Sequence, residues 1–161
     1  MKVIPVTTPE QFDAALAVRF EVFVGEQGVS PESERDHIDD DPSTVHALVC
    51  GVDGEALATG RLIAPHADVI HGEGSIMDPA NPHIGRVAVC ASARGTGAGR
   101  AVMEFLEAAA LARYGAHGTV RVELSAQDQA MPFYQRLGYT AHGAGYLDEG
   151  IPHHDAYKDV S

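Results

Sequence analysis

The chain has 161 residues, which suits a single domain, 1–161, that can bury a hydrophobic core without disulfides or a structural metal. Acidic residues outnumber basic ones by 23 to 11, and the formal charge of −12 argues against nucleic acid or an anionic membrane as a partner. No apolar run approaches the roughly 18 to 20 residues of a membrane-spanning helix, so we expect a cytoplasmic protein.

The start of the chain predicts a strand followed by a helix. Residues 2–6 have the composition of a short strand. Thr8, Pro9 and Gln11 then supply an N-cap, a proline at the first helical position and a capping-box glutamine. The apolar residues that follow recur at helical spacing, so the helix should run to about Val24.

A polar segment, a hairpin and a long loop come next. Residues 25–44 predict a loop with a short helical piece, and the run Asp39-Asp40-Asp41 within it should be solvated, because the Gly and Glu of a calcium loop are missing. Residues 46–52 and 55–64 are rich in strand-forming residues and are joined by Asp53-Gly54, a dipeptide favoured in tight hairpins. Residues 65–82 form a long loop, which we expect to lie near the substrate.

A glycine-rich run, residues 94–100, carries the strongest functional signal. Its sequence is Arg-Gly-Thr-Gly-Ala-Gly-Arg, and it stands between a strand-like run, 84–90, and a helical run, 101–114. Alternate glycines let backbone amides approach an anion, and the helix that follows adds the positive end of its dipole. Arg86, Arg94 and Arg100 add local positive charge. The run predicts a pyrophosphate cradle, with an ordinary turn as the alternative.

Two other nucleotide-binding loops fit this run less well. A P-loop needs a lysine after its last glycine, and the chain has no lysine between Lys2 and Lys158. A dinucleotide fingerprint would have an acid near Glu123, but Arg100 or Val102 stands where its third glycine belongs. Too few residues follow for a doubly wound sheet. A nicotinamide-dependent reductase therefore remains only as a third hypothesis.

The second half of the chain predicts a helix that ends at Gly115, a strand over about 120–124, and a second helix from about Asp128 to Leu137. That second helix should keep Pro132 in its first turn, where a missing amide matters least. Residues 139–142 and 156–160 predict two short final strands. The resulting order, β-α-β-β-β-α-β-α-β-β, predicts a mixed sheet with helices on its faces.

Two signatures resemble the GNAT acyltransferase superfamily across essentially the whole chain. Residues 94–99 match Arg/Gln-x-x-Gly-x-Gly/Ala after a fourth strand. Residues 127–139 match Asn-x-x-Ala-x-x-Phe-Tyr-x-x-x-Gly-Phe, with Gln127 in place of the Asn and Tyr139 in place of the last Phe. Residues 19–27 and 146–153 are similar to the ElaA-type bacterial branch and should border the acceptor pocket. The resemblance implies an α/β (α+β) fold with a twisted, mostly antiparallel sheet of about seven strands and helices on both faces.

The resemblance also implies an activity. The protein would be an acetyl-CoA-dependent N-acetyltransferase that moves an acetyl group to a primary amine of a small molecule, by direct attack in a ternary complex. Acetyl-CoA or coenzyme A would be the co-substrate, no metal would be needed, and the protein would be a monomer or homodimer. The implied coenzyme A ligands are Val87, Ala88, Val89, Arg94, Gly95, Thr96, Gly97, Ala98, Gly99, Arg100, Gln127 and Tyr134.

The catalytic groups are less fully specified by the resemblance. Tyr134 is the expected acid that protonates the leaving sulfur. Gly85 stands at a fourth-strand position where many relatives carry a catalytic Glu, so the base that accepts the proton of the amine must lie elsewhere. Glu26, Asp148 and His153 are the candidates. A noncatalytic acyl-CoA-binding sensor, which keeps the cradle and lacks a base, is the alternative function.

Overall fold

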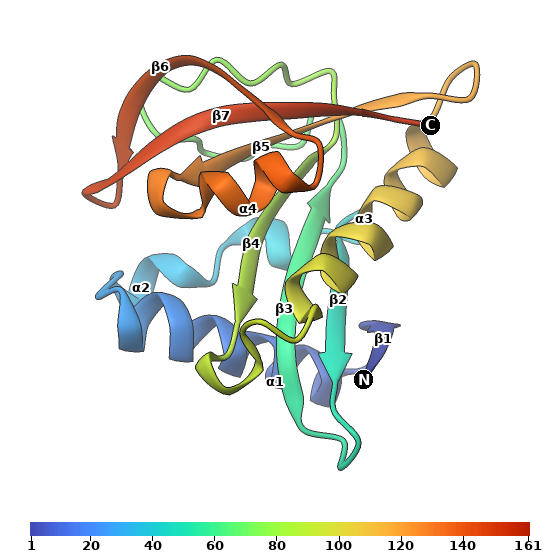
Figure 1. The fold of residues 1–161 in the computed structure, drawn as a ribbon, viewed down its shortest axis with the longest axis vertical. Coiled ribbons are helices and arrows are strands. Elements are labelled where there is room, and N and C mark those ends of the chain that lie inside the picture. The colour runs from blue at the N-terminus through green and yellow to red at the C-terminus, as the bar shows by residue number, and fades with distance from the viewer.

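The computed structural model describes residues 1–161, and its centre is a seven-stranded sheet with helices on both faces (Figure 1). The strand order is β1-β2-β3-β4-β5-β7-β6, and every neighbouring pair is antiparallel except β4 and β5. This confirms the mixed, mostly antiparallel sheet. The strands are β1 (Lys2–Pro5), β2 (Val45–Cys50), β3 (Ala56–Ile63), β4 (His83–Val89), β5 (Val120–Gln127), β6 (Thr140–Asp148) and β7 (Ile151–Val160).

Helical segments cover the two faces of the sheet unequally. One face carries the long α3 (Ala98–Tyr114) with the short α4 (Met131–Arg136), and η3 (Ala91–Ala93) and η4 (Asp128–Ala130) precede them. The other face carries α1, η1, α2 and η2, and we call it the acceptor face because it carries most of residues 19–27, for which the resemblance implies a place beside the acceptor pocket. None of the helices has both the length and the apolar character required to span a bilayer. The bounds on the acceptor face are α1 (Pro9–Arg19), the π-helical η1 (Phe20–Glu26), α2 (Pro31–Glu34) and η2 (His37–Asp40).

The start and stop signals of the helices act as the sequence predicts. Thr8 Oγ1 accepts a hydrogen bond from Gln11 N–H at 3.2 Å, and Gln11 Oε1 accepts one from Thr8 N–H at 3.1 Å, which completes the capping box of α1. Gly115 ends α3, and Pro132 lies in the first turn of α4. The largest hydrophobic core lies between α3, α4 and the sheet, where Val102, Met103 and Leu106 are fully buried.

The last two strands are longer than the sequence indicates. Residues 143–145 are Gly-Ala-Gly, and Pro152 follows soon after, so this stretch has the composition of a loop. In the fold β7 pairs with β5 along eight residues, and β6 pairs with β7 across an irregularity between His142 and Tyr146. Gly143 has φ of +80° within that irregularity. Pairing with β5 therefore extends β7 past the short run expected, pairing with β7 extends β6, and Tyr146 and His153 lie in the sheet.

The parallel strands β4 and β5 separate almost as soon as they meet. Their register contains a single pair, His83 with Glu123. Beyond this pair β4 follows β3 as far as Val89, while β5 follows β7 as far as Gln127. The sheet is therefore open between two of its central strands, and the glycine-rich run begins near the open end of β4.

Candidate active site

The glycine-rich run forms an uncapped helix N-terminus with free amides. Gly95 and Gly97 have φ of +79° and +89°, which residues with a Cβ rarely adopt, and a Cβ at either position would meet nothing within 4 Å. Gly97 is the N-cap of α3, and no side chain caps this helix. Its first backbone hydrogen bond runs from Ala101 N–H to Gly97 O at 3.0 Å, which leaves the three preceding amides without helical partners. This geometry suits a diphosphate.

Gly99 serves a different purpose, because it lets three elements pack closely. A Cβ on Gly99 would lie 3.1 Å from Phe133 Cζ in α4 and 3.3 Å from Val89 Cγ2 in β4. The absence of a side chain therefore brings the start of α3 against the end of β4 and the face of α4. The anion cradle and the open edge of β4 become one continuous surface.

The open edge of β4 offers unpaired backbone groups to a ligand. Cys90 N–H donates to Leu57 O of β3 at 2.9 Å, and the groups of a strand alternate between its two edges. The N–H group of Val89 therefore points toward the opening, whereas that of Ala88 points toward β3. Of the three amides expected to bind the cofactor arm, this alternation favours that of Val89.

Both arginines of the cradle are held by carboxylates. Arg94 Nη2 lies 2.5 Å from Glu26 Oε1, and Arg94 Nε donates to Val89 O at 3.2 Å. Arg100 Nε lies 2.7 Å from Glu104 Oε1 on the exposed side of α3. Glu26, a candidate base, is thus placed beside the cofactor cradle and orients Arg94.

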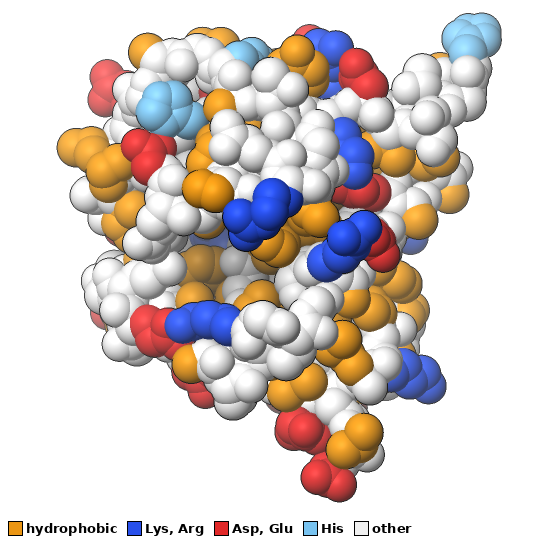
Figure 2. Space-filling model, viewed as in Figure 1, with side chains coloured by type: hydrophobic (Ala, Val, Ile, Leu, Met, Phe, Trp, Pro, Cys, Tyr) orange, Lys and Arg blue, Asp and Glu red, His pale blue; other side chains and the backbone are white.

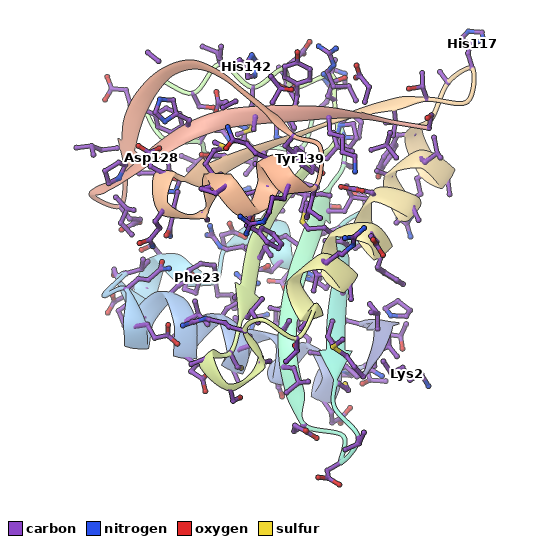
Figure 3. The ribbon with its side chains drawn as sticks, in the orientation of Figure 1. Lys2, Phe23, His117, Asp128, Tyr139 and His142 are labelled. Carbon is purple, nitrogen blue, oxygen red and sulfur yellow. The ribbon has the colours of Figure 1, made fainter.

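The surface is hollowed between the part of the molecule that carries α1 and α2 and the part that carries α4 and β5. Basic side chains lie on both sides of this hollow (Figure 2). Phe23 of η1 and Asp128 at the end of β5 lie on opposite sides of the opening (Figure 3). The two sides are linked by a hydrogen bond of 2.6 Å from Gln127 Nε2 to Gln27 Oε1, while Gln129 Nε2 donates to Gln127 Oε1 at 2.8 Å. Gln127 thus connects η1 with the end of β5.

Tyr134 is buried in α4 between two other aromatic rings. Phe133 and Tyr139 meet its ring edge to face at centroid distances of 5.0 and 5.9 Å. Its hydroxyl makes no hydrogen bond within the chain, and burial raises the pKa of this phenol well above its ordinary value. Tyr134 therefore stays protonated at neutral pH and can donate a hydrogen bond.

The acceptor face carries a polar cluster on β5, β6 and β7. Asp155, 1% exposed, accepts hydrogen bonds from Tyr146 Oη at 2.5 Å and from Ile76 N–H at 2.6 Å, and Ser125 Oγ contacts the same Tyr146 hydroxyl. Burial, with the Asp155 hydrogen bond, raises the pKa of Tyr146 to about 12. The contact with Ile76 docks the loop 65–82 onto this face.

His153 is the candidate base that lies within this cluster. It pairs with Gln127 across the sheet, and its ring stacks on that of Tyr146 at 6.1 Å. His153 Nδ1 lies 2.7 Å from Ile151 O, which can only accept, so Nδ1 carries a proton and Nε2 is left with a lone pair in the neutral ring. Asp148 lies at the turn between β6 and β7. No three His, Cys, Asp or Glu side chains are arranged to hold a metal ion.

Sequence reasoning missed the Tyr146–Asp155–Ser125 group. The strand-like alternation of residues 153–157 would have placed His153 and Asp155 on one face of β7, but the expected strand began only at residue 156. The pairing of Asp155 with Ser125 across β5 and β7 is a long-range contact that no local pattern encodes.

A buried ionic cluster attaches residues 31–40 to the sheet. Arg19 bonds Glu34 at 2.9 Å and Asp39 at 2.8 Å, and Arg61 bonds Asp36 at 2.6 Å and the same Asp39 oxygen at 2.8 Å. The expectation that Asp39 is solvated is therefore wrong, because its side chain is fully buried. Burial opposes its ionisation, but Arg19 and Arg61 outweigh burial and hold the pKa of Asp39 well below its usual range.

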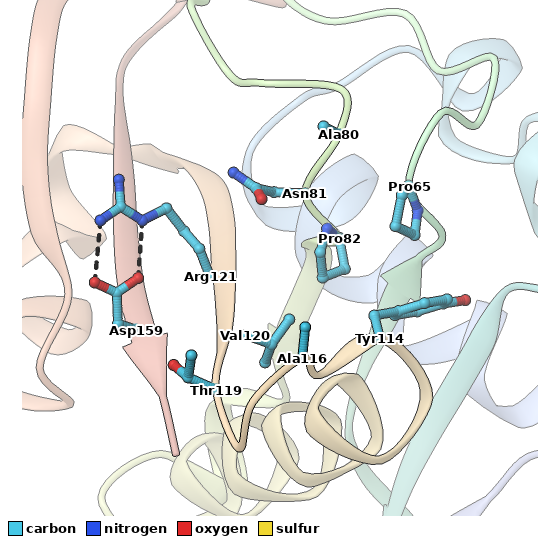
Figure 4. A pocket seen from close by; sticks show the side chains of 10 residues that line it. All are labelled: Pro65, Ala80, Asn81, Pro82, Tyr114, Ala116, Thr119, Val120, Arg121 and Asp159. Carbon is cyan, nitrogen blue, oxygen red and sulfur yellow. Dashed lines mark hydrogen bonds and ion pairs between the residues drawn. The ribbon is translucent and has the colours of Figure 1, made fainter.

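A cavity of about 440 Å³ lies away from this site (Figure 4). Arg121 and Asp159, which form an ion pair of 2.8 Å, stand at its edge. Gln127 lies six residues further along β5 than Arg121, roughly 20 Å away at the rise of an extended strand. The cavity is therefore at the opposite end of the sheet from the cradle. Its lining is Pro65, Ala80, Asn81, Pro82, Tyr114, Ala116, Thr119, Val120, Arg121 and Asp159.

The fold places the chain among acyl-CoA N-acyltransferases. A structure of such an enzyme from Pseudomonas aeruginosa matches with a TM-score of 0.78 and 31% identity, over 98% of this chain and 99% of that one. Escherichia coli ElaA matches with a TM-score of 0.78 and 25% identity, over 98% of each chain, which confirms the expected likeness to ElaA-type proteins.

Sequence comparison agrees with the fold. A family model described as an acetyltransferase (GNAT) domain matches residues 21–159. YjcF of Bacillus subtilis (strain 168), an uncharacterised N-acetyltransferase, is 37% identical over 161 residues, covering 99% of this chain and 100% of the relative. The chain belongs to the GNAT family of acetyltransferases.

Proposed function

We propose that this protein transfers an acetyl group from acetyl-CoA to a primary amine of a small molecule in the cytoplasm, by direct attack within a ternary complex. The observation that carries the proposal is the junction of two features. The uncapped start of α3, which suits a diphosphate, adjoins the open edge of β4, which suits an extended amide-bearing arm.

Different residues would bind the diphosphate and the extended arm of the cofactor. The amides of Gly95 and of residues 97–100 would hold the diphosphate, with Arg94 oriented by Glu26, whereas the amide of Thr96 donates to Ala93 O at 3.3 Å. The N–H group of Val89, together with that of Val87 as the resemblance implies, would bind the arm and polarise the thioester carbonyl. Gln127 would close the cleft from the β5 side through its bond to Gln27. Acetyl-CoA supplies the activated acyl group and a thiol leaving group.

Proton transfer would involve one residue on each side of the thioester. An amine of pKa near that of lysine, about 10.4, is mostly protonated at neutral pH, so its proton must be removed before attack. Among the candidate bases we favour His153, because its Nδ1 is fixed by Ile151 and its Nε2 can accept. Tyr134 donates its hydroxyl proton to the sulfur that leaves, and its lack of any other hydrogen-bond partner keeps this proton available.

The test mixes the protein with acetyl-CoA and a panel of primary amines and follows release of free thiol. We expect turnover with at least one amine, and we expect Tyr134→Phe to lower kcat about 100-fold, the lower end of the range for a positioned acid. The substitution removes an oxygen that bonds nothing, so the fold and the affinity for coenzyme A should be retained. Tyr114→Phe, at the distant cavity, is the matched control.

Two outcomes would count against this proposal. An unchanged rate in Tyr134→Phe would remove Tyr134 from the role of acid. Tight calorimetric binding of coenzyme A, together with no thiol release from any amine, would instead indicate the acyl-CoA sensor that lacks a base.

A further inference from the structure

A bulge in β4 turns an arginine toward the acceptor face. Gly85 pairs with Arg61 and Ala88 pairs with Thr59, so two residues of β4, Arg86 and Val87, stand opposite Gly60. Arg86 has φ of +52°, an unusual value for a residue with a side chain. Its guanidinium consequently reaches Asp36 of the acceptor face, the same carboxylate that binds Arg61. Strained backbone of this kind is concentrated at functional sites.

Open space lies above Gly85 on that same face. Directly paired residues share a face, so a side chain on Gly85 would point the way that Arg61 points. A Cβ on Gly85 would meet nothing within 4 Å, whereas one on Gly60, the glycine of the neighbouring strand, would lie 2.6 Å from Val102. Gly85 is also two residues beyond the last contact of β4 with β5, where the strands have begun to separate. The space therefore adjoins the proposed site of acetyl transfer.

Arg61 has a buried nitrogen that lacks a partner. The residue is 3% exposed, and its two terminal nitrogens bind Asp36 and Asp39 at 2.6 to 2.8 Å. Its Nε is buried and makes no hydrogen bond. Buried donors in native proteins almost always have an acceptor, so Arg61 is an incompletely paired member of the cluster.

Arg86 is the most weakly paired arginine of the cluster. Its contacts to Glu34 and Asp36 are 3.3 and 3.4 Å long, compared with 2.6 to 2.9 Å for Arg19 and Arg61. Its Nη1 has no partner and its side chain is 31% exposed. Burial, followed by the charge of Arg61, lowers the pKa of Arg86, which shows that its neighbours compensate its charge incompletely.

We infer that the space above Gly85, bordered by Arg86 Nη1, binds a carboxylate of the acceptor, so that the acceptor is an amino carboxylate. The inference rests on the proposed function, because it names the substrate class of the same site. Gly85 and Val87 are two residues apart on β4, so several bonds separate the amine from the carboxylate. Glu34, Asp36 and Asp39 balance the charges of the three arginines, so the attraction for a carboxylate comes from the long contacts and partial exposure of Arg86.

The test compares two probes that differ only in charge, 5-aminopentanoate and 5-aminopentanamide, by thiol release with acetyl-CoA. We expect kcat/KM for the carboxylate to exceed that for the amide at least tenfold. Arg86→Gln and Gly85→Ala should each bring this ratio close to one. Gly85 has an ordinary φ and open surroundings, so Gly85→Ala fills the site without disturbing the fold. Arg113→Gln, an exposed arginine in the last turn of α3, should leave the ratio unchanged.

A binding measurement separates this inference from the proposed activity. Calorimetry with coenzyme A present compares 5-acetamidopentanoate with 5-acetamidopentanamide. The native protein should bind the carboxylate at least tenfold more tightly than the amide, and the variants Arg86→Gln and Gly85→Ala should not. If no amine releases thiol but this preference is found, the transferase activity fails and the carboxylate site stands. Equal binding of the two compounds by the native protein, or a preference that survives both Arg86→Gln and Gly85→Ala, would overturn the inference.

Discussion

Two side chains of the site, Tyr134 and His153, differ in how their protons are held. Tyr134 has a hydroxyl with no partner and a pKa raised by burial, so its proton is retained until a negative atom approaches. His153 has one ring nitrogen fixed as a donor to Ile151 O, so the other nitrogen is the accepting one. Tyr134 is therefore suited to protonate the leaving sulfur, and His153 is suited to accept the proton of the amine.

His153→Gln should lower kcat about 100-fold toward an ordinary alkylamine, because a positioned base contributes at least this factor. The loss should be much smaller with an amine that is already neutral at the assay pH, since no proton then has to be removed before attack. His154→Gln is the matched control, because His154 Nδ1 bonds Asp128 at 2.6 Å and its ring is partly exposed. A similar loss with both kinds of amine would contradict a role in deprotonation.

At the scale of elements, the junction of η3, the glycine-rich run and α3 depends on backbone conformation. Gly95 and Gly97 hold left-handed angles with open space beside them, so neither packing nor side-chain capping explains why glycine stands there. The conformation aims amides outward at the start of a 17-residue helix. An anion-binding role explains this arrangement directly.

Gly97→Ala should raise the Kd for coenzyme A about tenfold, because the left-handed conformation costs a residue with a Cβ roughly 1–2 kcal/mol. Isothermal titration measures the change. Gly54→Ala provides the control, since Gly54 has φ of +80° and equally open surroundings in the β2–β3 hairpin, far from the cradle along the chain. Equal affinity in the two variants would show that the conformation of residue 97 is not needed for binding.

The elements that local chemistry specifies could be predicted from the sequence. The capping box at Thr8, the stop at Gly115 and the place of Pro132 depend on neighbours within a few residues, and each was correctly assigned. The extent of β6 and β7 could not be predicted, because it depends on the pairing of β7 with β5 and of β6 with β7, and glycines and a proline obscure the alternation.

The site could be predicted only where it is local in the sequence. The cradle is one continuous run of residues, so its geometry follows from its glycines. The buried cluster of Arg19, Asp39 and Arg61 joins residues from three separate elements. Acids in a polar segment look the same in sequence whether they face water or an arginine from a distant strand, so the burial of Asp39 could not be foreseen.

At the scale of the whole molecule, this ionic cluster attaches the segment 31–40 to the sheet and so completes the acceptor face. Arg19 makes short ion pairs with both Glu34 and Asp39, which are buried, while Arg61 also binds Asp39 and Arg86 contacts Glu34 at 3.3 Å. Burial raises the pKa of Glu34 against the influence of Arg86 and Arg19, so this carboxylate is costly to keep ionised without its partners.

Arg19→Met should therefore lower the free energy of unfolding by about 3–5 kcal/mol, the cost of breaking a buried ion pair by removing one of its members. Arg35→Met should cost about 1 kcal/mol or less, because the ion pair of Arg35 with Asp40 is exposed to solvent. Urea unfolding of the two variants beside the native protein gives both values. A loss in Arg19→Met as small as that in Arg35→Met would mean that water replaces the arginine in the cluster.

The early separation of β4 from β5 also affects how the protein avoids association with itself. Unpaired strand edges usually invite other chains to add a strand, and proteins generally protect such edges at the rim of a sheet. Here two bare edges face one another inside the molecule, beyond the pair His83 and Glu123. The opening that we propose for a cofactor arm therefore lies within the sheet and not at its rim, where an exposed edge would promote aggregation.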